Sequence, residues 1–168
     1  LVAGNVDEII YIANADFSEI EYVSDAYEAV WGRPVEELYE DATAFVDGID
    51  PRDRGAFEDD FAAMREDIRA GTPAENYEFE FRVRRPDGEV RWVIANGYPV
   101  ETGSGENRYV GIAEDVTERR ELERTRRELF ENVSDGLVVH EPADGEIVDV
   151  NERFCEITGY DRDALLGE

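Results

Sequence analysis

The stretch NYEFEFRVRRPDGEVRWVIANGYPV, residues 76–100, carries the clearest structural signal in the chain. Its first apolar residues alternate with polar ones, which is the period of a strand with one buried face. These residues are Tyr77, Phe79, Phe81 and Val83. Pro86–Gly88 predicts a tight turn, and the residues after it predict a second strand. A third strand, RYVGIAEDV (108–116), follows the loop GSGEN, so three consecutive antiparallel strands are expected.

The residues before this stretch predict two more strands, followed by helices. Val6–Ala13 and Ile20–Val23 have the composition of strands. Residues 24–32 predict a helix with Ser24 as its N-cap and Gly32 as its end. A short helical turn is expected at residues 33–38, where Pro at a first-turn position costs no hydrogen bond.

A longer helix begins at Asp50 and Pro51 and ends before Gly71. Its apolar residues recur at spacings of four, three and four, which places them on one helix face. They are Phe57, Phe61, Met64 and Ile68. Five strands with the helices grouped between them predict an α+β domain, with a five-stranded antiparallel sheet and the helices packed on one face.

The chain also contains an internal repeat. When the sequence is shifted by 127 residues, Asn5–Asp41 falls on Asn132–Glu168 without a gap, and seven of the 37 positions are identical. The identities fall at strand ends, at the helix stop Gly32/Gly159 and in the next helix. Residues from about 131 onward therefore begin a second copy of the first domain, and the charged helix EDVTERRELE lies in the connection between the copies.

Acidic residues dominate the composition. There are 43 acidic and 17 basic residues, all of the latter arginine, and the formal net charge is −26. Because the acids are spread along the whole chain, we expect a haloarchaeal protein that works in concentrated salt, which screens self-repulsion. An ordinary acidic protein from a GC-rich genome is the alternative. A nucleic-acid partner is not expected, since phosphate binding needs a basic patch.

Cysteine content and hydropathy indicate the compartment. Cys155 is the single cysteine, so no internal disulfide is expected, which suits a reducing cytosol. No run approaches the roughly 18 apolar residues of a membrane span, and no signal peptide is visible at Leu1. We therefore expect a cytoplasmic protein without membrane contact. The missing initial Met and the end at Glu168 suggest a piece of a longer protein.

Four segments together resemble the PAS sensory family, including its carboxy-terminal half, often called PAC. They are YVSDAYEAVWGRPVEEL, IDPRDR, EFRVRRPDGEVRWV and GIAEDVTERRELE, the last of which contains the family's D-[IV]-T-E-R signature at residues 115–119. The second copy, NVSDGLVV…IVDVNERFCEITGYDRDALLGE, is similar to the family too. The resemblance implies a PAS domain at residues 1–116 with its PAC half at about 75–118. It also implies a linker helix at 117–130 and the start of a second, truncated PAS domain at 131–168.

The resemblance assigns signal relay to the end of the last strand, at Asp115, Thr117 and Glu118. The residue types suit that place, because an Asp can fix a strand end and a hydroxyl can satisfy an orphan N–H at a helix start. Simple capping by Thr117 is the structural alternative, and both roles can hold at once.

Two interpretations of the charged helix remain open. Its pairs of oppositely charged residues at i,i+4 add only a few tenths of a kcal/mol, and its apolar seam consists of Leu122 and Leu129 alone. Helices of this kind pair with a partner chain in the family, so a homodimer through the PAS domain and the linker helix is expected. A solvated linker is the alternative.

The resemblance places a ligand cavity between the long helix and the sheet. Its expected walls are Phe57, Phe61, Met64, Phe79, Phe81, Ile94 and Asn96. A packed core is the alternative. Cysteinyl-flavin and haem are disfavoured, because the first domain has no cysteine and the long helix has no histidine. Cys155 and His140 lie in the second copy, and no Cys/His cluster suggests a metal site. A non-covalent small organic ligand, or none, is what remains.

No catalytic motif accompanies these features. The chain has no glycine-rich phosphate loop and no ATP-binding boxes, so we expect it not to be an enzyme, although the parent protein could be a sensor histidine kinase of a two-component system. The resemblance implies a sensory module that detects a small ligand, a redox change or a protein state. The signal would pass through the helix to adjacent output domains. The alternative is a ligand-free dimerisation or spacing module in a transducer or transcriptional regulator.

Overall fold

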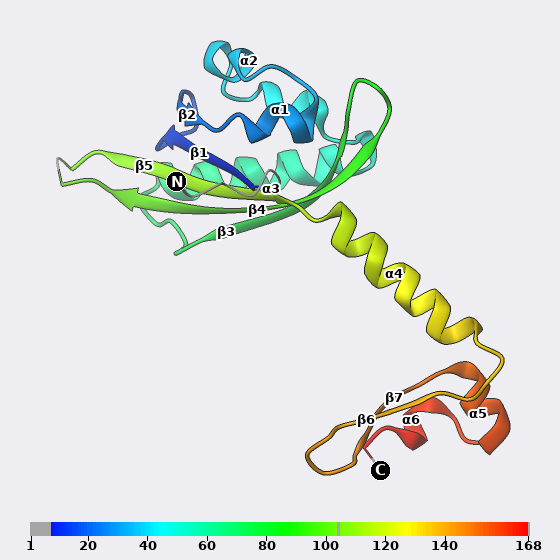
Figure 1. Ribbon diagram of the computed structural model, residues 1–168. Helices are drawn as coiled ribbons and strands as arrows, with labels where there is room; N and C mark the ends of the chain where they lie inside the picture. Colours follow the sequence, from blue (N-terminus) through cyan, green and yellow to red (C-terminus); the bar gives the residue numbers. More distant parts are fainter. Residues whose placement is uncertain (1–7, 104, 168) are drawn as a thin grey trace, which may run out of the picture. The chain divides into compact units, whose positions relative to one another are not determined.

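The structure is a computed structural model that describes residues 8–103 and 105–167. It consists of two compact units, of which the first ends at Thr117 and the second begins at Glu118 (Figure 1). The charged helix, from Glu118 onward, groups with the second unit. The first two residues of the strand expected at Val6–Ala13 lie outside the described residues.

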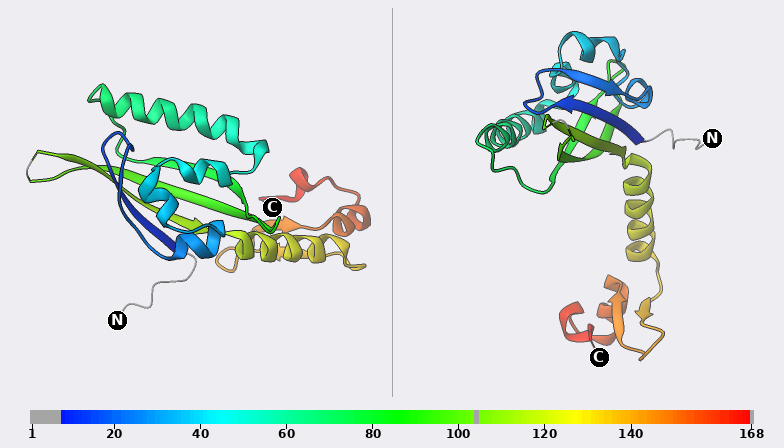
Figure 2. Two further views of the ribbon diagram at one scale, coloured as in Figure 1. Left: turned by 90° about the horizontal axis from the view of Figure 1, so that it is seen from above. Right: turned by 90° about the vertical axis from the view of Figure 1, so that its left-hand side faces the viewer.

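The first unit is built on a five-stranded antiparallel sheet with the strand order β2-β1-β5-β4-β3. Its strands are β1 (Glu8–Asn14), β2 (Ile20–Val23), β3 (Tyr77–Arg84), β4 (Val90–Glu101) and β5 (Asn107–Asp115). The helical segments cover one face of this sheet, whereas the other face is open (Figures 1 and 2). The predicted α+β architecture is confirmed.

The helical segments are α1 (Ala26–Trp31), α2 (Glu36–Glu40), the 3₁₀ helix η1 (Ala44–Gly48) and α3 (Pro51–Arg69). The predicted N-cap Ser24 is wrong. The residue before α1 is Asp25, which makes no side-chain cap bond, and the Ser24 hydroxyl instead accepts a hydrogen bond from the Ile10 N–H at 3.0 Å. No local pattern predicted η1, which is a short segment of mixed polarity. Gly32 ends α1 in the left-handed conformation, with φ of 68°, as its position predicts.

Helix α3 is fixed to the sheet at its first turn by carboxylates. The buried Asp50 caps the helix by accepting from the Arg52 N–H at 3.0 Å, and its other oxygen accepts from the Arg84 side chain on β3 at 2.9 Å. Asp53 pairs with Arg82, also on β3. The arginines hold the pKa of Asp50 well below its usual range. These bonds hold the buried Phe57, Phe61 and Met64 of α3 within the core.

The second unit repeats the opening of the first. It contains α4 (Thr117–Asn132), β6 (Val138–His140), β7 (Ile147–Val150), α5 (Glu152–Thr158) and α6 (Arg162–Leu165). The pairs Val138↔Val150, Val139↔Asp149 and His140↔Ile147 reproduce the β1–β2 register at an offset of 127 residues, including its irregularity. Gly159 ends α5 with φ of 76°, as Gly32 ends α1. The two segments therefore share a local fold.

Candidate functional site

The junction between β5 and α4 is fixed by a compact hydrogen-bond network. The Thr117 N–H donates to Asp115 Oδ1 at 2.9 Å, and the Thr117 hydroxyl donates to the same oxygen at 2.5 Å. The hydroxyl in turn accepts from the backbone N–H of Trp92 at 2.8 Å. The Val116 N–H donates to the Trp92 carbonyl at 2.8 Å. The start of α4 is thus bonded both to the end of the middle strand, β5, and to its neighbour β4.

The geometry divides the capping role between two residues. The Asp115 carboxylate accepts the first helical N–H, whereas the Thr117 hydroxyl, which is buried, serves the neighbouring strand. Arg91 lies 3.3 Å from the second Asp115 oxygen, which anchors the carboxylate to β4. Glu118 is exposed in the first turn, where a carboxylate interacts favourably with the helix dipole. Of the three expected relay residues, Asp115 and Thr117 are in contact, and Glu118 lies beside them on the surface.

The last turn of α4 is bonded to the rest of the second unit. The Asn151 side-chain amide donates to the Phe130 carbonyl at 2.9 Å, and Glu131 accepts from the Glu152 N–H at 2.9 Å and from Arg162 at 2.6 Å. Arg162 holds the pKa of the Glu131 carboxylate below its usual value. The last turn of α4 is therefore fixed to α5 and α6. Between its two ends, Leu122 and Leu129 are 70% and 66% exposed.

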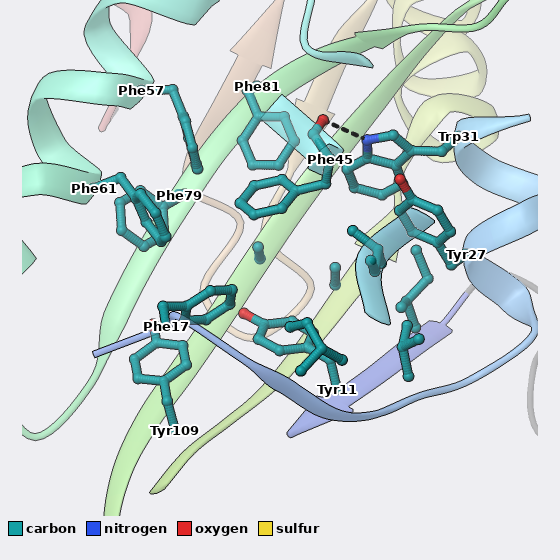
Figure 3. Close-up of a pocket in the computed structure, with 16 residues that line it drawn as sticks. Tyr11, Phe17, Tyr27, Trp31, Phe45, Phe57, Phe61, Phe79, Phe81 and Tyr109 are labelled. Carbon is teal, nitrogen blue, oxygen red and sulfur yellow. Dashed lines mark hydrogen bonds between the residues drawn. The ribbon is translucent and has the colours of Figure 1, made fainter. Parts of the chain in front are cut away.

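An apolar cavity of about 60 Å³ lies in the first unit (Figure 3). Six phenylalanines form much of its wall, with ring centroids of neighbouring pairs 5.0 to 6.4 Å apart; they are Phe17, Phe45, Phe57, Phe61, Phe79 and Phe81. The Trp31 indole N–H donates to the Phe45 carbonyl at 3.0 Å, which ties α1 to η1 beside the cavity.

Two tyrosines from the sheet line the same cavity. Tyr109 lies over Gly97 and Tyr11 over Gly111, and a Cβ atom at either glycine would overlap the tyrosine side chain. The glycines therefore leave room on the sheet for two rings whose centroids are 6.3 Å apart. In Figure 3 the Tyr11 hydroxyl points toward the ring of Phe17.

The expected cavity residues are only partly brought together. Phe57, Phe61, Phe79 and Phe81 line the cavity, whereas Met64 is buried without being among its lining residues. The expectation is wrong for Ile94 and Asn96. Side chains alternate along β4, and the buried residues that face the helices are Val93 and Ala95, so Ile94 and Asn96 lie on the open face of the sheet.

Several lining residues were not expected. Tyr11, Phe17 and Tyr109 come from segments that the resemblance did not connect with the cavity. Alternation along β5 offers a signal for Tyr109, because it shares a face with Gly111 and Ala113. The loop residue Phe17 has a φ of 59°, and neither its backbone nor its place in the core has a clear sequence signal.

The cysteine and histidine of the second unit do not form a metal site. Cys155 is half-buried on α5, and a His140 ring nitrogen lies 2.8 Å from the Gly145 carbonyl. Within residues 8–103 and 105–167, no group of three or more His, Cys, Asp or Glu side chains is arranged to hold a metal ion. Over the same residues, no helix has both the length and the apolarity to cross a bilayer.

Comparison with known proteins identifies the family. A model of the PAS fold matches residues 20–113, and a PAS domain model matches residues 123–168. The chain belongs to the PAS family, and its second unit matches the family as well. No curated protein matches the chain.

Several solved structures of sensory proteins are similar to this chain. A domain assigned to a light and redox sensing histidine kinase from Haloarcula marismortui is 33% identical, with a TM-score of 0.52 over 69% of this chain and 93% of that one. A sensory box histidine kinase/response regulator from Burkholderia thailandensis is 27% identical, with a TM-score of 0.50 over 76% and 93%. The N-terminal domain of a diguanylate cyclase with a PAS/PAC sensor from Marinobacter aquaeolei is 20% identical, with a TM-score of 0.54 over 67% and 98%, and shows the fold alone.

Proposed function

We propose that this chain is a cytoplasmic sensory module that detects a small ligand, a redox change or a protein state and relays it through α4 to a downstream output domain. The observation that carries this proposal is the hydrogen bond from the Trp92 N–H to the Thr117 hydroxyl, at 2.8 Å. It joins the first residue of the helix to a strand whose next inward side chains, Val93 and Ala95, belong to the core.

The relay follows from this connection. A change in the cavity that displaces Ala95 also displaces β4, and with it the Trp92 amide and carbonyl that hold Val116 and Thr117. A stimulus acts by favouring one of two arrangements of this network, since a ligand shifts an equilibrium only by its differential affinity. Because the last turn of α4 is bonded to Asn151, the shift reaches the second unit.

The sensor histidine kinase is the proposed output, in a haloarchaeal protein. Support comes from the domain of the Haloarcula marismortui protein assigned as a light and redox sensing histidine kinase, and from the charge of −26 without lysine. A non-covalent small organic molecule is the proposed ligand type, because the cavity is small and apolar. Catalysis is assigned to the parent protein and not to this chain.

A second candidate is a ligand-free module that dimerises through α4. The exposed Leu122 and Leu129 favour it, because they lie one heptad apart on a helix of otherwise polar character. Sedimentation of the chain in multimolar KCl separates the two: a dimer that Leu122→Gln and Leu129→Gln abolish supports the second candidate, and a monomer at all concentrations removes it.

Autophosphorylation of the full-length parent protein tests the proposed relay. Ala95→Val adds two carbons to the cavity wall in a strand-compatible form and should change the basal rate. Thr117→Val removes the hydroxyl at nearly constant volume, and in this background Ala95→Val should no longer change the basal rate. In a Thr117→Ser background, which keeps the hydroxyl, Ala95→Val should still change it. An Ala95→Val effect of the same size in the Thr117→Val background would contradict the proposal.

A further inference from the structure

We propose that the cavity of the first unit binds a small, neutral organic molecule that accepts a hydrogen bond from the Tyr109 hydroxyl. The inference rests on the proposed sensory function and specifies its ligand. It derives from three properties of the described cavity: the absence of ionised side chains from its wall, two lining tyrosines whose buried hydroxyls have no partner among the described residues, and its size.

The wall selects against charge. The sixteen lining residues within the described part of the chain are aliphatic, aromatic or tyrosine, and none is an Asp, Glu or Arg. Burial raises the pKa of Tyr11 and of Tyr109 well above the usual value, so both stay protonated at neutral pH and act as neutral hydroxyls. A carboxylate or an ammonium ion placed there would lose its hydration without gaining a partner of opposite charge.

Tyr109 supplies the polar contact. Its side chain is 1% exposed, and its hydroxyl has no hydrogen-bond partner among the described residues. A buried hydroxyl without a partner is costly, and buried polar groups in proteins are nearly always bonded. A ligand oxygen that accepts from Tyr109 recovers this loss.

The Tyr27 hydroxyl is also buried and without a hydrogen-bond partner, but its surroundings differ. Tyr27 lines the cavity too, but besides burial, which raises its pKa most, the charges of Arg33, Glu37 and Asp47 act on it. The neighbours of Tyr109 are aromatic: its ring centroid lies 6.3 Å from that of Tyr11 and 5.4 Å from that of Phe17. Tyr109 is therefore the donor that an apolar molecule would meet.

Size limits the ligand further. The cavity of about 60 Å³ is less than half of the roughly 150 Å³ at which an engineered apolar cavity binds benzene. Benzene has six non-hydrogen atoms, so by volume about two or three such atoms fit without rearrangement, and a molecule of about five fits only when the aromatic wall shifts. Water is a poor occupant, since a buried water makes about three hydrogen bonds and this wall offers few polar atoms.

Three probes of five non-hydrogen atoms separate these properties. They are butanone, which is neutral with an acceptor oxygen, 2-methylbutane, which is neutral without one, and propionate, which is anionic. Each is titrated into the 168-residue chain in multimolar KCl while backbone amide signals are followed by NMR. We expect saturable shifts at the amides of Ala95 and Tyr109 with butanone, weaker binding of 2-methylbutane and none of propionate.

Variants then assign the contact. Tyr109→Phe should lower the affinity for butanone by about five- to tenfold, as expected for the loss of one hydrogen bond. It should leave the affinity for 2-methylbutane unchanged. Tyr98→Phe, at an exposed tyrosine on the open sheet face, is the matched control and should change neither affinity. Ala95→Val should weaken the binding of both butanone and 2-methylbutane, because the larger side chain fills part of the cavity. Equal butanone affinity in Tyr109→Phe and the unmodified chain, binding of propionate, or no saturable shift with any probe would overturn the inference.

Failure here is distinguishable from failure of the proposed function. The relay experiment uses Ala95→Val and Thr117→Val without any ligand, so its outcome stands whether or not butanone binds. Conversely, binding is measured on the isolated chain and requires no output domain.

Discussion

Ser24 in the first unit and Asn151 in the second occupy the same place, at the corner between the second strand and the helix that follows it. Each exchanges two hydrogen bonds with the first strand. Ser24 Oγ accepts from the Ile10 N–H at 3.0 Å, and Asn151 Oδ1 accepts from the Leu137 N–H at 2.8 Å. The return bonds, from the backbone N–H of each corner residue, are 2.9 and 3.0 Å.

The longer side chain of Asn151 makes further hydrogen bonds. Its amide also donates to the carbonyls of Phe130 and Asp135, at 2.9 and 3.0 Å, whereas the described bond of the Ser24 side chain is the one to Ile10. Among the described residues, the corner of the PAS fold in the first unit closes its strand pair, and the corner in the second unit also binds the preceding helix. In this chain Asn151 bonds the last turn of α4 to the rest of the second unit.

The largest expected effect comes from removing this amide. Asn151→Ala leaves the Phe130 and Asp135 carbonyls without donors and the Leu137 N–H without an acceptor, so we expect the second unit to lose about 3 kcal/mol of stability. Hydrogen exchange of the β6 and β7 amides measures it. Ser24→Ala, the matched change in the first unit, should cost about 1 kcal/mol. Equal losses in the two units would remove the distinction between the corners.

A second prediction concerns the carboxylates that fix helices in each unit. Asp50 is fully buried and has a pKa below its usual range, because of Arg52 above all. Its ionised form therefore stabilises the first unit above the ordinary pKa of about 3.9, and this contribution is lost as the pH falls toward the depressed value. Asp50→Asn should lower the free energy of unfolding by about 2 kcal/mol at pH 7 through the weakened cap and ion pairs.

Denaturant unfolding of the first unit at pH 7 and pH 3 measures this. The difference between the variant and the unmodified chain should shrink at pH 3. A loss of the same size at both pH values would contradict the assignment of the effect to the ionised carboxylate.

Glu131 is the corresponding carboxylate of the second unit and should show the smallest effect. Its side chain is 27% exposed, and its partners Arg127 and Arg162 are more exposed still. Glu131→Gln should cost about 0.5 to 1 kcal/mol at low salt and less in multimolar KCl, where exposed pairs are screened. Hydrogen exchange at the Glu152 amide is the readout. A loss that grows with salt would show that the contact is not chiefly electrostatic.

Much of this arrangement could be predicted from the sequence, for reasons that individual residues show. The alternation at Tyr77–Val83 and the turn at Pro86–Gly88 predict the hairpin because their signals are local. The repeat offset places β7 over β2 to the residue. The pairing of Asp115 with Thr117 could likewise be predicted, since both residues lie in one signature.

The remainder depends on contacts between distant residues. Val93 and Ile94 are both apolar, so alternation alone does not decide which of them faces the helices, and the expected wall took the wrong one. The partner of the Thr117 hydroxyl is a backbone N–H 25 residues earlier. The choice between Ser24 and Asn151 depends on what precedes each corner, which no local pattern encodes.

Hydrogen exchange at the first turn of α4 tests the relay most directly, in the unmodified chain, Ala95→Val, Thr117→Val and the double variant. If the Trp92–Thr117 bond couples the cavity wall to the helix, Ala95→Val changes exchange at the amides of residues 119–121, and Thr117→Val removes most of that change. The coupling free energy of this cycle should then be about 1 kcal/mol. Additive effects, with a coupling free energy near zero, would contradict the account.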